Sequence, residues 1–336
     1  MKTVSKVLIV GATGFLGQNA AEQLLSNGVV GVRATGRDRG VGQVLMTQGA
    51  EFVPLDLTRA SEAEIQALVK GCDAIWYCAG TSPEGNVSPD EHEKVNFIAV
   101  KELFKAARES TTVRRFIYVS SSNLYIAGGH QHEIKEDFRA PLVGDEFVRS
   151  KLMAESYLRT VGYGATNIRT TILRPGVVYG PYERNWLPSI VDSVRREGKL
   201  VIPAGGGSVR DFTYVGNLVY AMYLATLSPV SRNEAVNVTD LQPMNVTRFF
   251  GKLFEHAGLK CKLAFRPVGW LEMTTSFDAT RGIRNPVLNK VNLSWWVNDF
   301  TLDMNQAEDV LGYLEPLVPA DEALEITGAW LRGQLN

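Results

Sequence analysis

The chain has 336 residues, of which 45% are hydrophobic and 21% are charged, and its formal net charge is −1. This length allows one large domain or two ordinary ones, and the near-zero charge gives no basis for nucleic acid or an anionic membrane as partner. Three scattered cysteines without a C-x-x-C pair argue against a disulfide framework or metal site. No apolar run approaches the roughly 18 residues of a membrane span, so we expect a cytoplasmic protein with a small-molecule substrate.

Short β-branched runs alternate with segments of helical periodicity. This alternation predicts an α/β fold with a doubly wound parallel Rossmann-type sheet. Glycine and proline become frequent after residue 175. We therefore assign 1–175, with 209–240 returning to it, to a dinucleotide-binding domain, and 176–208 with 241–336 to a smaller, mostly helical substrate-binding part. The predicted strands are Val7–Val10, Val30–Thr35, Glu51–Leu55, Ala74–Cys78, Arg115–Ser120, Thr170–Pro175 and Ala235–Val238.

Apolar residues recur at helical spacing between these strands. Leu16, Ala20 and Leu24 predict a first helix that closes at Gly28. A second amphipathic pattern over residues 95–107 predicts another helix.

Three glycines, Gly11, Gly14 and Gly17, lie between the first predicted strand and the first predicted helix. Glycine permits a sharp turn and a close approach of the backbone to a pyrophosphate, and a helix N-terminus offers free N–H groups to it. The spacing is G-x-x-G-x-x-G. It indicates dinucleotide binding, with a plain tight turn as the alternative.

Arginines crowd the end of the second predicted strand, where the adenosine ribose is expected. An acidic residue there would bind a ribose 2′-hydroxyl, whereas arginine would accept a 2′-phosphate. Arg33, Arg37 and Arg39 favour NADP(H), while Asp38 is the opposing signal and keeps NAD(H) as the alternative. Asp56, after the third strand, either reaches the adenine edge or caps the following helix.

Ser120, Ser121 and Ser122 end the fifth predicted strand. Ligands of such sheets bind at the carboxyl ends of the strands, although serines there also cap turns. Reduction of a carbonyl group needs a proton donor and groups that hold the substrate oxygen. These serines are therefore candidates for the reaction centre.

Seven segments together resemble the extended short-chain dehydrogenase/reductase family, part of the NAD-dependent epimerase/dehydratase superfamily. They follow the family's order from residue 7 to about 225, and the late "FTLDMNQAEDVLGY" is most similar to the 3β-hydroxysteroid dehydrogenase-like branch. The resemblance implies a homodimer formed through helices near 95–107 and 146–160. The segments are "GATGFLG", "AIWYCAG", "KVNFIAVKELFKAAR", "FIYVSSSNLY", "FVRSKLMAE", "LRPGVVYGP" and "RDFTYVGNLVYAMYLA".

The resemblance also implies roles for single residues. The family's catalytic hydroxyl falls on Ser121, its lysine on Lys151, and its active-site asparagine on Asn96, which we expect to be structural. Arg210 matches an arginine that grips a diphosphate in nucleotide-sugar members, and a salt bridge with Asp211 is the favoured alternative. The implied substrate contacts are Ser122, Tyr125, Tyr179 and Arg210. Beside the three glycines and Lys151, the implied cofactor contacts are Thr13, Phe15, Leu16, Arg37, Asp56, Leu57, Cys78, Ala79, Gly80, Pro175, Val177 and Val178.

The family's catalytic tyrosine falls on Phe147, four residues and one helical turn before Lys151. Phenylalanine cannot donate a proton, and loss of a general acid typically costs about 10²–10⁴-fold in rate. Either a tyrosine was replaced by engineering or very recently in an otherwise intact site, or the phenylalanine is native and another group moves the proton. Tyr125, His130 and His132 are the candidates for that group, and the two histidines lack further partners for a metal site.

These observations predict an NADP(H)-dependent oxidoreductase acting on a secondary alcohol or ketone. Without an evident anion clamp, an apolar or carrier-borne substrate is favoured over a nucleotide sugar, whose epimerase or dehydratase chemistry is the alternative. A non-catalytic NADP-sensing regulator is a third hypothesis, motivated by Phe147. Trp295 and Trp296 would face opposite ways in a strand, with at least one in the core. The segments expected to line the substrate are 183–190, 203–208 and 266–296.

Overall fold

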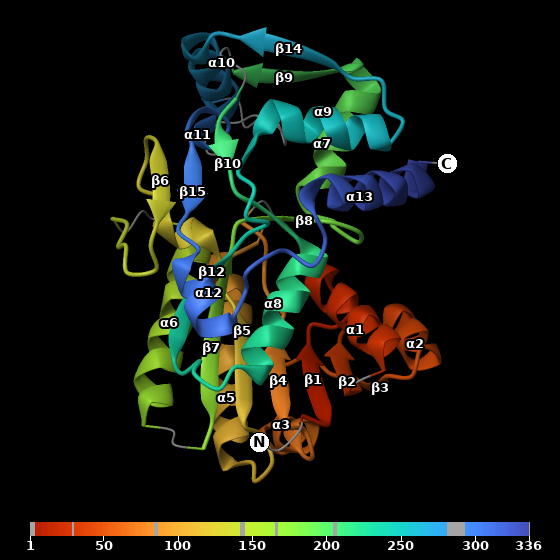
Figure 1. Ribbon diagram of the computed structural model, residues 1–336, viewed down its shortest axis with the longest axis vertical. Helices are drawn as coiled ribbons and strands as arrows, with labels where there is room; N and C mark the ends of the chain where they lie inside the picture. The colour runs from red at the N-terminus through yellow and green to blue at the C-terminus, as the bar shows by residue number, and fades with distance from the viewer. Residues whose placement is uncertain are drawn as a thin grey trace.

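A seven-stranded parallel sheet forms the larger layer of the computed structural model, in the order β12-β7-β5-β4-β1-β2-β3 (Figure 1). All seven predicted strands are present, with ends displaced by at most one residue. They are β1 (Lys6–Val10), β2 (Gly31–Gly36), β3 (Glu51–Pro54), β4 (Ala74–Tyr77), β5 (Arg115–Val119), β7 (Arg169–Pro175) and β12 (Glu234–Val238). The structure describes residues 4–28, 30–83, 87–141, 145–164, 167–203, 207–280 and 293–335. The predicted substrate-lining segments 203–208 and 266–296 lie partly outside these ranges.

Helices cover both faces of this sheet, as the apolar strands predicted. The central strand β4 is buried along its whole length, because parallel strands gain stability only when both faces leave water. One face packs against α1 (Phe15–Asn27), α2 (Arg39–Thr47), α8 (Val215–Leu227) and α12 (Asn305–Leu311). The other packs against α3 (Glu62–Val69), α5 (Ala99–Glu109) and α6 (Glu146–Tyr163). The doubly wound α/β prediction is confirmed.

The strand order reverses at β1, whose neighbours are β2 on one side and β4 on the other. The connections leave these strands in opposite directions, which opens a crevice at their carboxyl ends. The loop from Gly11 to Gly17 follows β1, and Ser120 follows β5 at the same edge. The topology therefore brings the predicted cofactor loop and the predicted reaction centre to one edge of the sheet.

The helix predicted over 95–107 is longer than expected and contains a π-helical turn. It begins as α4 (Pro89–Glu93), continues as the π-helix η1 (Lys94–Ile98) and ends as α5. Ser88 caps it by accepting a hydrogen bond from the Glu91 amide. π-Helical turns occur often at functional sites, and this one contains the buried Asn96.

The remaining elements form a second region, in the upper part of Figure 1, around an aromatic core. Phe212 and Phe249 stack at a ring separation of 3.8 Å, and Trp296 stacks on Phe250 at 5.4 Å. Its elements are β8 (Val177–Tyr179), β11 (Phe212–Tyr214), α7 (Leu187–Glu197), β9 (Lys199–Pro203), β14 (Lys262–Arg266), α9 (Val246–His256), α10 (Val268–Thr280), α11 (Leu293–Val297) and α13 (Ala320–Leu335). A further sheet has the order β13 (Met244–Asn245), β10 (Val209–Arg210), β15 (Phe300–Leu302) and β6 (Gln131–Ile134).

Trp295 and Trp296 lie in the short helix α11, so the strand geometry considered for them does not apply. Their rings meet edge to face at 4.9 Å. Trp296 is buried in the core, as expected of one of the two. Among the described helices, none is both long and apolar enough to span a membrane. The predicted domain boundaries remain a prediction.

Candidate active site

The glycine loop has a geometry that excludes larger side chains. Gly11 has φ +77°, and a Cβ on it would lie 2.7 Å from the Ala79 backbone. A Cβ on Gly17 would collide with the Gly11 carbonyl group. Gly14, the N-cap of α1, is exposed and provides no side-chain cap. The first turn of α1 therefore offers N–H groups to an anion, and the loop fits a pyrophosphate.

Other predicted cofactor contacts lie at the carboxyl ends of the parallel strands, so the topology gathers them at the same edge. Thr13, Phe15 and Leu16 belong to the glycine loop and α1; Asp56 and Leu57 follow β3; Cys78, Ala79 and Gly80 follow β4; Pro175 ends β7; and Val177 and Val178 form part of β8. A Cβ on Gly80 would lie 3.4 Å from the Lys151 ammonium nitrogen, so this loop passes close to the lysine.

Two charged residues near the ribose end serve the fold. The Arg33 guanidinium forms an ion pair with Glu51 at 2.9 Å and donates to the Leu68 carbonyl at 2.8 Å. Asp38 caps α2, with its carboxylate accepting from the Gly40 amide at 2.9 Å. The acidic residue that kept NAD(H) as the alternative in the sequence analysis therefore serves as a helix cap.

Arg37 and Arg39 are exposed at the end of β2, on the predicted ribose side. Asp56 lies close enough to Arg37 to be affected by its charge. Burial opposes ionisation of Asp56, but hydrogen bonds from Thr58 and the nearby arginines lower its pKa overall. The helix-cap alternative for Asp56 is wrong, because Ser61 caps α3 in a capping box with Glu64.

Lys151 is a buried ammonium group at the carboxyl edge of β5. Its side chain is 5% exposed, and Nζ donates to the Val119 carbonyl oxygen at 2.9 Å. Burial lowers the pKa of Lys151 to about 8, although the charge of Glu155 and the Cys78 thiol oppose the shift. The lysine therefore places a positive charge in a water-poor site, where its field is strong.

Phe147 lies one turn before Lys151 and is 6% exposed. Its ring packs with Leu124 and Val148, and its centroid lies 6.0 Å from Lys151 Nζ. The Phe147 carbonyl accepts a hydrogen bond from Ser150 Oγ at 2.8 Å. An aromatic ring thus stands one helical turn before the lysine, without a hydroxyl group.

A polar network joins the β4 loop to α4 and α6. The Asn96 amide nitrogen donates to Ser150 Oγ at 2.9 Å and to Thr81 Oγ1 at 2.8 Å, and its oxygen accepts from the Thr81 amide at 3.1 Å. Thr81 Oγ1 also lies 2.6 Å from Nδ1 of His92. The His92 ring meets the Phe147 ring at 6.0 Å and 72°. His92 was not singled out from the sequence, although it precedes Asn96 by four residues, about one helical turn.

The three serines after β5 differ in their surroundings. Ser121 Oγ is half-buried, accepts from the Asn123 amide at 3.1 Å and retains its own proton to donate. Ser122 is buried, and Ser120 Oγ is buried without a hydrogen-bond partner among the described residues. Ser121 thus both caps the short helix η2 (Ser122–Tyr125) and offers a hydroxyl group.

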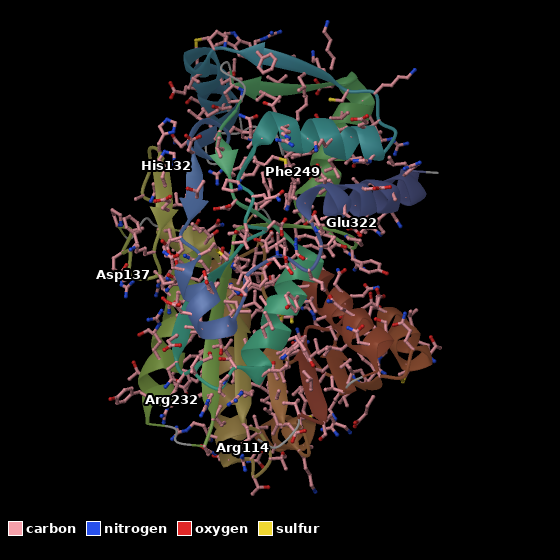
Figure 2. All side chains as sticks on the ribbon, viewed as in Figure 1. Arg114, His132, Asp137, Arg232, Phe249 and Glu322 are labelled. Atoms are coloured by element: carbon pink, nitrogen blue, oxygen red, sulfur yellow. The ribbon has the colours of Figure 1, made fainter. Side chains whose placement is uncertain are left out.

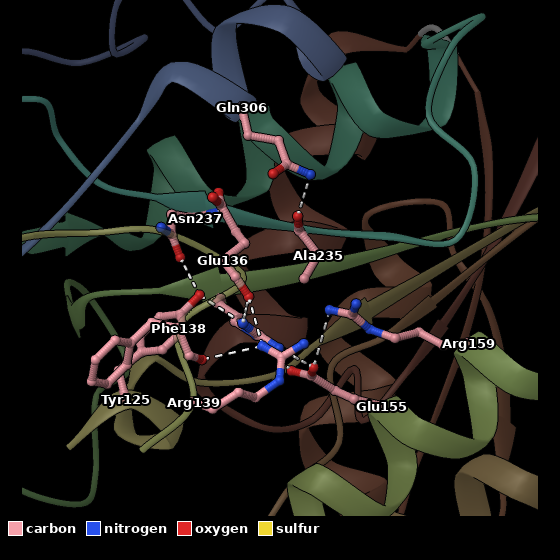
Figure 3. Close-up of polar contacts among 10 residues, drawn as sticks. Tyr125, Glu136, Phe138, Arg139, Glu155, Arg159, Ala235, Asn237 and Gln306 are labelled. Atoms are coloured by element: carbon pink, nitrogen blue, oxygen red, sulfur yellow. Dashed lines mark hydrogen bonds and ion pairs between the residues drawn. The ribbon is translucent and has the colours of Figure 1, made fainter. Parts of the chain in front are cut away.

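Tyr125 belongs to a buried network shown in Figure 3, and its hydroxyl group is fully used. The hydroxyl donates to Asn237 Oδ1 at 2.7 Å and accepts from the Arg174 guanidinium at 2.7 Å, which in turn donates to Glu155 at 2.9 Å. The side chain is 1% exposed, and burial raises the pKa of Tyr125 above its usual range. This placement gives Tyr125 a structural role, and the role predicted for it in contacting substrate or moving a proton does not fit.

Tyr179 is likewise buried, and its hydroxyl donates to Asp240 Oδ2 at 3.0 Å. Burial raises the pKa of Asp240 to about 6, against hydrogen bonds from Asn217, Tyr214 and Tyr179 that lower it. A substrate contact through the Tyr179 hydroxyl does not fit this arrangement.

His130 and His132 have a partner that the sequence did not reveal. Asp299 Oδ2 lies 3.3 Å from His130 Nδ1 and 3.7 Å from His132 Nε2, and the two imidazole rings are stacked. One ligand atom of each residue lies within 4.8 Å of the others, so our statement that the pair lacks partners is wrong. Figure 2 shows His132 on β6, which pairs with β15 in the smaller sheet.

Arg210 is enclosed by aromatic rings. Its guanidinium lies over the rings of Trp295 and Phe300 at 4.8 and 5.3 Å, and Nε donates to the Trp295 carbonyl oxygen at 2.7 Å. Burial lowers the pKa of Arg210 to about 9, although the charge of Asp299 opposes this. The predicted salt bridge between Arg210 and Asp211 is wrong. The Asp211 carboxylate instead accepts a hydrogen bond from the Leu302 amide, and these two residues form no ion pair in the described structure.

The chain is similar in sequence to known proteins along most of its length. The family model described as "NAD dependent epimerase/dehydratase family" matches residues 7–239. The uncharacterized protein YbjS of Escherichia coli is 34% identical over 97% of this chain and 98% of its own length. A mouse sterol-4-alpha-carboxylate 3-dehydrogenase is 24% identical over 96% of this chain and 90% of its own.

Among solved structures, a tyrosine-to-phenylalanine mutant of the UDP-glucuronic acid 4-epimerase of Bacillus cereus superposes with a TM-score of 0.77. It is 20% identical, over 98% of this chain and 100% of its own, and was solved with NAD and a fluorinated UDP-glucuronic acid. At this identity the likeness shows the shared fold alone.

Proposed function

We propose that this chain, which belongs to the NAD dependent epimerase/dehydratase family, transfers a hydride between NADP(H) and a secondary alcohol or ketone. It is an oxidoreductase of the extended short-chain type. The observation that carries the proposal is the buried ammonium group of Lys151. It lies beside the loop after β4 and donates to the last residue of β5, two residues before Ser121. A lysine so placed stabilises negative charge on a substrate oxygen or on an acid–base group.

In this proposal, each part of the site has a separate role in binding or catalysis. The N–H groups at the start of α1 bind the pyrophosphate, and Ser121 donates its O–H to the substrate oxygen. Lys151 supplies positive charge and orients the ribose beside the reaction centre. The nicotinamide cofactor supplies or accepts the hydride when it is bound.

Two features support NADP(H) rather than NAD(H). Arg37 and Arg39 stay exposed at the ribose end, whereas Arg33 is paired with Glu51. The acidic residue that could have bound a ribose hydroxyl, Asp38, already caps α2. A 2′-phosphate would find exposed guanidinium groups at this end of the site.

The enclosed Arg210 supports an apolar substrate over a nucleotide sugar. Arg210 is 5% exposed and its Nε donates to the Trp295 carbonyl oxygen, so a diphosphate could reach it only after this packing is broken. The mouse relative is named for a sterol carboxylate and not for a nucleotide sugar, which supports the same preference.

Fluorescence titration with NADPH and NADH tests the cofactor, and a panel of cyclic and steroid ketones with NADPH tests the reaction. Binding of neither cofactor below millimolar concentration would refute the oxidoreductase proposal. A rise in melting temperature with UDP would instead favour the epimerase alternative, since a ligand that binds only the native state stabilises it. Tighter binding of NADH than of NADPH would overturn only the assignment of Arg37.

A further inference from the structure

His92 and Phe147 lie at the same level of the site. Helices in a doubly wound fold run opposite to the strands, so their first turns lie at the carboxyl edge of the sheet. His92 is in the first turn of the helix that continues to Asn96, and Phe147 is in the first turn of the helix that continues to Lys151. Each ring thus stands about one turn nearer the edge than the polar group below it.

The imidazole of His92 is a polar ring that is largely buried. It is 7% exposed, and its edge meets the Phe147 ring. A buried polar ring needs a hydrogen-bond partner, and Thr81 Oγ1 provides one at 2.6 Å from Nδ1. This bond satisfies Nδ1 as it would in an ordinary core histidine, but among the described residues Nε2 has no hydrogen-bond partner, and the imidazole lies beside the ring that replaces the family's phenol.

The contact with Thr81 engages one ring nitrogen of His92, Nδ1. Thr81 Oγ1 accepts one hydrogen bond from Asn96 and has a second lone pair for Nδ1–H. With Nδ1–H bound in this way, Nε2 is the ring nitrogen left to exchange a proton with a substrate. An imidazole can serve as a general acid and as a general base.

We propose that His92 delivers the proton to the substrate oxygen, and takes it back in the reverse direction, in place of the phenol that Phe147 lacks. This inference rests on the proposed oxidoreductase function. During reduction, the carbonyl carbon gains a hydride from the reduced nicotinamide cofactor, and the π electron pair moves to the oxygen. That oxygen then takes the proton from Nε2–H of the imidazolium, which leaves a neutral alcohol, a neutral imidazole and the oxidised cofactor. Solvent restores the proton on Nε2.

The other residues considered as proton donors form contacts away from Phe147. The Tyr125 hydroxyl is held by Asn237 and Arg174 in the interior. His130 and His132 lie against Asp299 in the smaller sheet.

Matched variants test the role of His92. His92→Gln keeps a hydrogen-bonding side chain that cannot titrate, and His132→Gln makes the same change at an exposed histidine. We expect His92→Gln to lower kcat/KM by about 10²-fold or more, with unchanged NADPH affinity and circular dichroism, and His132→Gln to have little effect. In the double variant His92→Gln/Phe147→Tyr, the phenol should restore at least about tenfold of the lost rate.

Nuclear magnetic resonance gives a readout that does not depend on turnover. The ring resonances of His92 in the whole protein should shift on addition of NADP⁺ and again with trifluoroethanol, a non-reacting alcohol, whereas those of His132 should not. Resonances of His92 that ignore both ligands, or full activity of His92→Gln, would overturn the inference while leaving the proposed function intact. Failure of wild type to bind either nicotinamide cofactor would overturn both.

Discussion

Phe147→Tyr would place a phenol one turn before Lys151. The pKa of this phenol would measure the combined effect of the lysine charge and of burial on a hydroxyl group at this position. Lys151 Nζ lies 6.0 Å from the Phe147 ring centroid. At an effective dielectric constant of about 20, a unit charge at about 6 Å favours a phenolate by about 3 kcal/mol, or about 2 pKa units. Burial opposes this shift, because a charged phenolate loses hydration. Since burial lowers the pKa of Lys151 to about 8, the two groups would titrate as a coupled pair.

We therefore expect the new phenol to ionise at least about one pH unit below an ordinary tyrosine. Near-ultraviolet difference absorbance between Phe147→Tyr and the parent protein, followed from neutral to alkaline pH, isolates this group from the other tyrosines. The control is the same substitution in a Lys151→Met background, where the pKa of the phenol should move above its ordinary value. Equal ionisation with and without the lysine would refute the assignment of this helix face to the reaction centre.

Three further outcomes follow from single contacts. Arg37→Ala should weaken NADPH binding by about 10-fold or more, the usual worth of a hydrogen bond to a charged group, and leave NADH binding unchanged in fluorescence titrations. The unfolded chain binds a proton at Lys151 up to its ordinary pKa of 10.5 and the folded one only to about 8, so the free energy of unfolding should rise with pH across this window. Relative to Lys151→Met, the gain in urea unfolding should reach about 3 kcal/mol, and a flat difference would contradict the burial argument. Tyr125→Phe should cost about 1–3 kcal/mol of stability, because Arg174 and Asn237 each lose a buried partner, while kcat falls little; a collapse of kcat at full stability would return Tyr125 to the reaction centre.

Local patterns predicted the sheet and the glycine loop well, because the physical causes lie within a few residues. Apolar runs such as β4 are buried on both sides wherever helices alternate with strands, and Gly11 and Gly17 mark backbone contacts that exclude a Cβ. The failures concern contacts between distant segments. Asp299 contacts His130, although more than half of the chain length separates them in sequence. Arg210 contacts Trp295, which lies in a short helix that the sequence pattern did not predict.

The meeting of His92 with Phe147 was missed for a different reason. Helical spacing from Asn96 indicates that His92 lies one turn earlier, but the π-helical turn between them changes the face on which each side chain emerges. The partner ring belongs to α6, and no sequence period relates the two helices. Only the packing of α4 on α6 shows the contact.

The bonds that join the helix of His92 to the helix of Phe147 involve neither ring. Asn96 holds Thr81 on one side and Ser150 on the other, and Ser150 holds the Phe147 carbonyl group. The two helix starts are therefore fixed by amide and hydroxyl groups, whichever side chains stand above them. A proton donor lost from α6 can on this scaffold be replaced by one on α4 without a change of backbone, which is why the double variant with a restored phenol is the sharpest test of the site.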